Sequence, residues 1–139
     1  MKKTLLALIC GAGIVLNGFL GCSQPNNLEN ELTKSYTGFF KALNKKNYTE
    51  IEKYTDRNVF EQLKKVNINK KISVGTPKIY TYETTKRMEK NSIYMFKNAN
   101  GKYFQYSSPN YTPQKGDSLA ISNRIAIVIF RDNKIIEIP

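Results

Sequence analysis

The spacing of apolar residues changes once along this chain, near residue 66, and that change limits the folds open to it. Between residues 28 and 65 apolar side chains recur every three or four positions, which is the spacing of one helix face. After residue 66 β-branched and aromatic residues alternate, as in strands. Helices first and strands afterwards, without an internal repeat, predict a single α+β domain with an antiparallel sheet. A helical cap joined to a small open β-barrel over residues 72–138 is the alternative.

Local signals place the individual elements. The first helix is predicted over residues 28–43 with Asn27 as its N-cap, a second near Tyr48, and a third starting at Thr55 or Asp56. The strand half predicts, in order, a strand over 78–85, a hairpin of 92–98 and 102–108 around Gly101, a long loop over 108–118, a strand over 124–130 and a last strand over 135–138. The strand over 124–130 is apolar on both faces, so it is predicted to be central or covered on both faces. "KGD" at 115–117 is interpreted as a turn.

The first 21 residues have the layout of a secretory signal. A short basic start, Lys2 and Lys3, precedes an apolar run that several glycines and Asn17 interrupt. The run is at the short end for a transmembrane helix, and the next charged residue is Glu29, so no basic flank follows it. An uncleaved membrane helix and ordinary signal cleavage after Ser23 are the alternatives to the interpretation that follows.

The junction Phe19-Leu20-Gly21-Cys22 resembles a bacterial lipobox, in which a lipid-carrying cysteine follows a small residue. Phe19 stands where leucine is usual, and Leu20 where a small residue is usual. The resemblance implies a diacylglyceryl group on the Cys22 sulfur, cleavage between Gly21 and Cys22, and a fatty acid such as palmitate on the new amino terminus. The bilayer is then the first expected partner, through acylated Cys22.

This resemblance divides the chain into a lipoprotein signal peptide (1–21), the lipidated cysteine with a polar tether (22–27) and a single α+β domain (28–139). It places the protein at the bacterial cell envelope as a membrane-anchored lipoprotein. In a bacterium with two membranes, the absence of aspartate after Cys22 favours the outer membrane.

Residues 36–65 carry a second resemblance. An aromatic-rich helix with Phe39 and Phe40, the break "KKNY" and a second amphipathic stretch precede a strand-rich half. This pattern resembles the cone-shaped α+β superfamily named after nuclear transport factor 2. The resemblance implies N-terminal helices packed on a curved antiparallel sheet that leaves a pocket. Members include enzymes, binding proteins and dimerisation modules, so the fold does not select a function.

The residue types needed for common catalytic sites are scarce. The chain has no histidine, and Cys22 is the one cysteine after the leader, which excludes a Ser-His-Asp arrangement and the usual zinc sites. Acidic residues do not have metal-loop spacing. A cluster of Tyr54, Asp56 and Arg57 is interpreted as a helix start. We therefore expect no enzyme activity, no metal and no cofactor.

The chain carries a formal charge of +11 at pH 7. Its basic residues lie in short pairs, Lys45/Lys46, Lys64/Lys65, Lys70/Lys71 and Lys86/Arg87, and not in one stripe. Together with the export signal, this distribution counts against nucleic acid as a partner. If the charge has a function, anionic lipid headgroups or polymers of the cell envelope are the expected partners, because the export signal brings the protein to them.

Tyrosines in the strand half are the candidate ligand or partner surface, because a tyrosine offers an apolar body and a polar tip. These are Tyr80, Tyr82, Tyr94, Tyr103, Tyr106 and Tyr111. The sequence predicts a lipid-anchored envelope module without catalytic activity that binds a protein, a glycan or an anionic polymer. A pocket protein or enzyme of the cone-shaped type, and an envelope exclusion or immunity lipoprotein of a mobile element, are the alternatives. The oligomeric state is not predicted.

Overall fold

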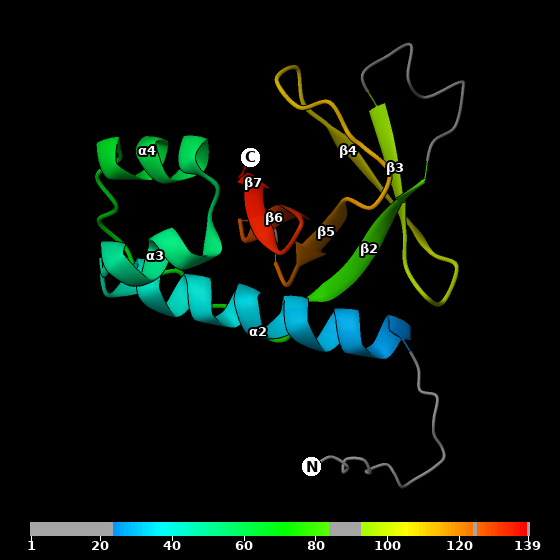
Figure 1. Ribbon diagram of the computed structural model, residues 1–139, viewed down its shortest axis with the longest axis horizontal. Helices are drawn as coiled ribbons and strands as arrows, with labels where there is room; N and C mark the ends of the chain where they lie inside the picture. The colour runs from blue at the N-terminus through cyan, green and yellow to red at the C-terminus, as the bar shows by residue number, and fades with distance from the viewer. Residues whose placement is uncertain (1–23, 84–92, 124, 139) are drawn as a thin grey trace, which may run out of the picture. The chain divides into compact units, whose positions relative to one another are not determined.

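The computed structural model describes residues 24–83, 93–123 and 125–138 (Figure 1). The chain separates into two units, Met1–Glu31 and Leu32–Pro139. Of the first unit, only the opening turns of one helix lie within the described residues. Three helices followed by a six-stranded antiparallel sheet within these residues confirm the predicted α+β class.

The three helices are α2 (Gln24–Asn44), α3 (Tyr48–Tyr54) and α4 (Arg57–Lys65). Helix α2 begins before Asn27, the predicted N-cap, so the helix includes part of the predicted tether. Asn47 caps α3 by accepting the Glu50 N–H. Asp56 caps α4 by accepting the Val59 N–H at 2.8 Å, which confirms the predicted helix start and assigns the cap to Asp56 in place of Thr55.

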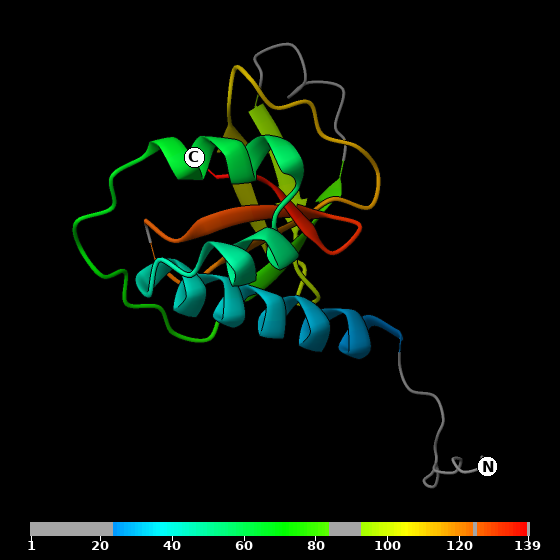
Figure 2. The same cartoon turned by 60° about the vertical axis from the view of Figure 1, so that its left-hand side comes forward.

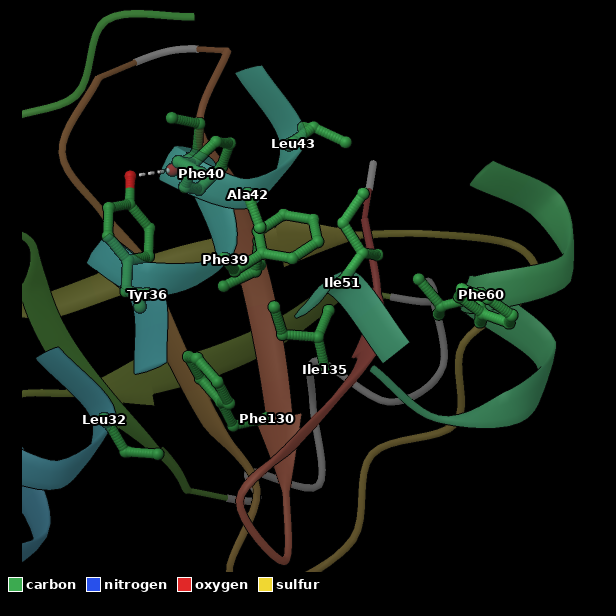
Figure 3. Packing of buried hydrophobic residues seen from close by; sticks show 14 of the residues in the cluster. Leu32, Tyr36, Phe39, Phe40, Ala42, Leu43, Ile51, Phe60, Phe130 and Ile135 are labelled. Atoms are coloured by element: carbon green, nitrogen blue, oxygen red, sulfur yellow. Dashed lines mark hydrogen bonds between the residues drawn. The ribbon is translucent and has the colours of Figure 1, made fainter. Parts of the chain in front are cut away.

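One face of α2 is buried together with residues of α3, α4 and the strands, and we call this set the helix-side cluster (Figure 3). From α2 it contains residues at the predicted spacing of three and four, which places them on one side of the helix. Its buried members are Leu32, Tyr36, Phe39, Phe40, Ala42, Leu43, Ile51, Val59, Phe60, Ile79, Ala120, Ala126, Val128, Phe130 and Ile135.

Two contacts of α2 fix it against its neighbours. The fully buried Tyr36 hydroxyl donates to the Ala126 carbonyl at 2.6 Å and accepts the Ser122 N–H at 3.2 Å. Gly38 faces the ring of Tyr54 in α3, and a Cβ at this position would lie 2.7 Å from the Tyr54 Cζ. Glycine is therefore required here for the close approach of the two helices.

The strands are β2 (Lys78–Glu83), β3 (Ile93–Lys97), β4 (Tyr103–Ser107), β5 (Ser118–Ile121), β6 (Ile127–Arg131) and β7 (Lys134–Glu137). Their order in the sheet is β4-β3-β2-β5-β6-β7, and every neighbouring pair is antiparallel. Strands β3 and β4 therefore follow one another on one side of β2. The segment after β4 crosses to the other side of β2, where β5, β6 and β7 follow one another in the same way. Helices α3 and α4 contact β7 (Figure 1).

The predicted strands are largely confirmed. The hairpin β3–β4 turns at Gly101, whose φ of +78° requires the left-handed region that glycine adopts easily. β6 lies between β5 and the edge strand β7, and its alternate residues enter two different buried clusters, so it is covered on both faces as predicted; it begins at Ile127, later than predicted. β5 was not among the predicted strands, because its four residues "SLAI" follow a loop and give no period of their own.

Candidate functional site

Five of the six candidate tyrosines lie in one cluster on the face of the sheet opposite the helix-side cluster. We call it the aromatic cluster, and its buried members are Tyr80, Phe96, Tyr106, Tyr111, Leu119 and Ile129. Tyr82 and Tyr94 are half-buried against it. The grouping follows from strand geometry, because alternate residues of a strand share a face.

Strand register brings the aromatic rings into contact. Tyr94 stands opposite Tyr106 in the β3–β4 pair, and Tyr82 stands opposite Phe96 in the β2–β3 pair. The rings of Tyr106 and Tyr111 meet edge to face at 5.8 Å between centroids. Such arrangements stabilise beyond the area that they bury, so these rings have a packing role.

Tyr103 is the exception among the candidates. It lies next to Phe104 in β4, so its side chain is on the other face of the sheet, and it is 47% exposed. Its hydroxyl donates to Glu83 at 2.5 Å, and the Lys97 ammonium lies 5.5 Å from its ring centroid. Of the six tyrosines it presents the most surface to solvent.

The segment between β4 and β5 carries a buried ion pair that sequence reasoning did not identify. Asp117 is fully buried, and Arg131 at the end of β6 donates to it from both Nε and Nη2 at 2.8 Å. The Tyr111 hydroxyl at 2.5 Å and the Gln114 N–H at 2.9 Å donate to the same carboxylate. Arg131 also donates to the Thr112 carbonyl at 3.2 Å, so the pair fastens this segment to the sheet.

The hydrogen bonds of Asp117 define its protonation state. Burial alone favours the neutral acid, but the donors from Arg131, Tyr111 and Gln114 outweigh it and lower the pKa of Asp117 below its usual value. Burial and the bond to this carboxylate raise the pKa of Tyr111. Arg131 Nε bonds one oxygen, Oδ1, and Arg131 Nη2, Tyr111 and Gln114 bond the other, Oδ2. These bonds and its burial make Asp117 the point that holds the segment between β4 and β5 to the sheet.

A second polar contact joins the two edges of the sheet. The Tyr106 hydroxyl in β4 and the Ser108 hydroxyl just after it donate to Glu137 in β7, at 3.1 and 3.0 Å. β4 and β7 are the first and last strands in the sheet order, so one carboxylate links the two edges. Burial, and secondarily Glu137, raises the pKa of Tyr106, which keeps this hydroxyl protonated as a donor.

The remaining predicted site residues, Gly21 and Cys22, lie outside the described residues. In the part of the chain that the structure describes, no group of three or more histidine, cysteine or acidic side chains is placed to hold a metal ion. A helix with the length and apolar character needed to cross a bilayer does not occur within residues 24–83, 93–123 or 125–138.

Comparison with family models, curated proteins and solved structures finds no match to this chain.

Proposed function

We propose that this protein is a lipid-anchored, non-catalytic binding module of the bacterial cell envelope. The observation that carries the proposal is Gly21-Cys22 at the boundary between an apolar run with a basic start and a polar segment. One acyl chain holds a protein at a membrane only marginally, whereas two or more give stable anchoring. A diacylated Cys22 meets that requirement.

We further propose that the helices pack on a curved sheet whose edges approach one another. Two observations support this arrangement. The helix-side cluster mixes residues of all three helices with residues of the strands. The bonds of Tyr106 and Ser108 to Glu137 link the edge strands β4 and β7 by a side chain, without backbone pairing. A helical cap on a small open barrel also accommodates this edge contact and stays the alternative.

The six candidate tyrosines differ in solvent exposure, and only those with exposed surface are favoured for binding a partner. Tyr80, Tyr106 and Tyr111 are buried, and their rings or hydroxyls are engaged inside the fold. Tyr103 is exposed on one face of the sheet, and Tyr82 and Tyr94 are half-buried on the other, so the two faces are separate candidate surfaces for an envelope protein, a glycan or an anionic polymer.

The anchor is tested by metabolic labelling with an alkyne fatty acid in the producing bacterium. We expect label on the wild type and on Cys10→Ser, and none on Cys22→Ser, because Cys10 lies inside the leader. Cys10→Ser is the matched control, since it makes the same change at the other cysteine. An unlabelled wild type, or equal labelling of Cys22→Ser, contradicts the proposal.

The binding surface is tested by crosslinking the anchored protein to its envelope neighbours and recovering it. We expect Tyr103→Ala to lose a neighbour that the wild type recovers, while its circular dichroism spectrum stays unchanged because Tyr103 is exposed. Tyr82→Phe and Tyr94→Phe probe the hydroxyls of the half-buried pair without removing their rings. Recovery of the same neighbours by all three variants refutes both candidate surfaces.

A further inference from the structure

Three segments far apart in the sequence meet at the C-terminal end of α2. The Asn44 side chain donates to the Ile72 carbonyl at 2.8 Å and accepts the Ile72 N–H at 2.7 Å. The Asn123 side chain, in the turn between β5 and β6, donates to the Ser73 carbonyl at 2.9 Å. Figure 2 shows the end of α2, the segment before β2 and the β5–β6 turn together at the left of the domain. We call this place the corner.

The corner concentrates positive charge. Two lysine pairs adjoin the Asn44–Ile72 contact, Lys45 and Lys46 on one side and Lys70 and Lys71 on the other. Within the described residues none of these four forms an ion pair. Their charges are therefore not neutralised locally and are available to an anionic partner.

The corner also presents an aliphatic side chain to solvent. Ile125, in the β5–β6 turn, is 72% exposed, more than any other large apolar residue described. The Ile125 backbone is held by its described neighbours, because Asn123 accepts the Ile125 N–H at 3.1 Å and the next residue, Ala126, is fully buried and bonded to Tyr36. An apolar side chain held outward on an anchored backbone gains free energy only when a partner covers it.

We propose that the corner is a membrane contact, in which Ile125 enters the interface of an anionic bilayer and the four lysines bind headgroup phosphates. Basic residues beside an exposed apolar side chain are the combination that interfacial proteins use. A soluble anionic polymer would use the lysines but would not cover Ile125, so a bilayer fits both features. The inference rests on the proposed function only for bringing the protein to a membrane. It adds a second contact beside the lipid on Cys22.

The test uses the full chain with Cys10→Ser and Cys22→Ser, which leaves the apolar leader to hold it at a vesicle and removes native thiols. Ile125→Cys is introduced and labelled with the environment-sensitive dye NBD. Vesicles of equal parts phosphatidylglycerol and phosphatidylcholine are compared with pure phosphatidylcholine. Asn100→Cys, in the exposed β3–β4 turn, is the matched labelling site away from the corner.

We expect a blue shift and higher emission at position 125 on the anionic vesicles only, and no change at position 100. Lys70→Glu with Lys71→Glu removes the shift, since each lysine near an anionic surface contributes about fivefold to binding. Lys102→Glu with Lys115→Glu makes the same change in net charge elsewhere and leaves the shift intact.

Three results overturn the proposal: no shift on anionic vesicles, an equal shift on pure phosphatidylcholine, or equal loss with both charge-reversed pairs. Retention on immobilised polyphosphate without a shift on vesicles assigns the corner to an anionic polymer and also overturns the membrane contact. Because these variants lack Cys22, their behaviour is independent of the fatty-acid labelling that tests the anchor.

Discussion

Replacing Asp117 with asparagine tests the role of the buried ion pair. Asparagine keeps the shape of the side chain but places an NH2 group where one oxygen was, so at least one of the four donors to Asp117 loses its acceptor. A buried donor without an acceptor costs about 1–3 kcal/mol. Removing one member of a fully buried ion pair costs about 3–5 kcal/mol, and the 30% exposure of Arg131 lets water compensate part of that.

We therefore expect Asp117→Asn to lower the free energy of unfolding by about 3 kcal/mol at neutral pH, or the melting temperature by about 12 °C. Urea unfolding followed by near-ultraviolet circular dichroism measures it, because Tyr111 contributes to that signal. Asp132→Asn is the matched control. Asp132 lies in the β6–β7 turn at a φ of +52°, which asparagine also adopts, and we expect a change below about 0.5 kcal/mol.

The pH dependence gives a second readout. Because the folded state lowers the pKa of Asp117, its ionisation stabilises the protein above the unfolded-state value of about 4. That contribution is lost as pH falls through the lower, folded-state pKa. The difference between wild type and Asp117→Asn should therefore shrink below about pH 4. An effect of Asp117→Asn no larger than that of Asp132→Asn, or a gap that widens in acid, refutes the structural role.

Three further perturbations probe other parts of the fold. Tyr36→Phe removes the hydroxyl bonded to Ala126 and should cost about 2 kcal/mol in urea unfolding, against less than about 1 for Tyr103→Phe at an exposed site. Gly38→Ala should lower the free energy of unfolding by about 1–3 kcal/mol, because the added Cβ meets the Tyr54 ring. Helix propensity alone predicts the opposite, a stabilisation of about 1 kcal/mol. A variant more stable than the wild type therefore contradicts the contact. In alkali, the free energy of unfolding should fall above about pH 10, because Tyr106 and Tyr111 ionise there in the unfolded chain but stay protonated in the folded one. Absorbance at the tyrosinate band should show these two tyrosines titrating only when the protein unfolds. Titration of all tyrosines before unfolding argues against the burial of this pair.

The sequence predicts which residues share a face of the sheet, because that depends only on the local alternation within a strand. The alternation in β2, β3 and β4 predicts that Tyr80 and Tyr82 share a face, and the structure places both at the aromatic cluster. The alternation does not predict how deeply each ring is buried, because burial depends on which residues from other segments cover that face of the sheet. Here Tyr111, from the segment after β4, covers Tyr94 and Tyr106.

Features that depend on distant residues were not predictable. Asp117 lies in a triplet correctly interpreted as a turn, with Gly116 at a φ of +97°, but its partner Arg131 is 14 residues further on in another strand. No spacing rule connects two such positions. The lysine pairs show the same limit, since Lys45/Lys46 and Lys70/Lys71 are far apart in the sequence but flank the two residues, Asn44 and Ile72, that are bonded to each other.

β7 closes the fold through contacts with residues much earlier in the sequence. The Ile135 carbonyl accepts the Asp56 N–H at 2.9 Å, and Glu137 links β7 to β4. Tyr36 is bonded to Ala126, 90 positions later. During synthesis the helices emerge before the strand residues that bury their apolar faces. Folding of this topology therefore depends on contacts between residues far apart in the sequence and is slow, and a chain ending before Ile135 would expose the helix-side cluster to proteolysis.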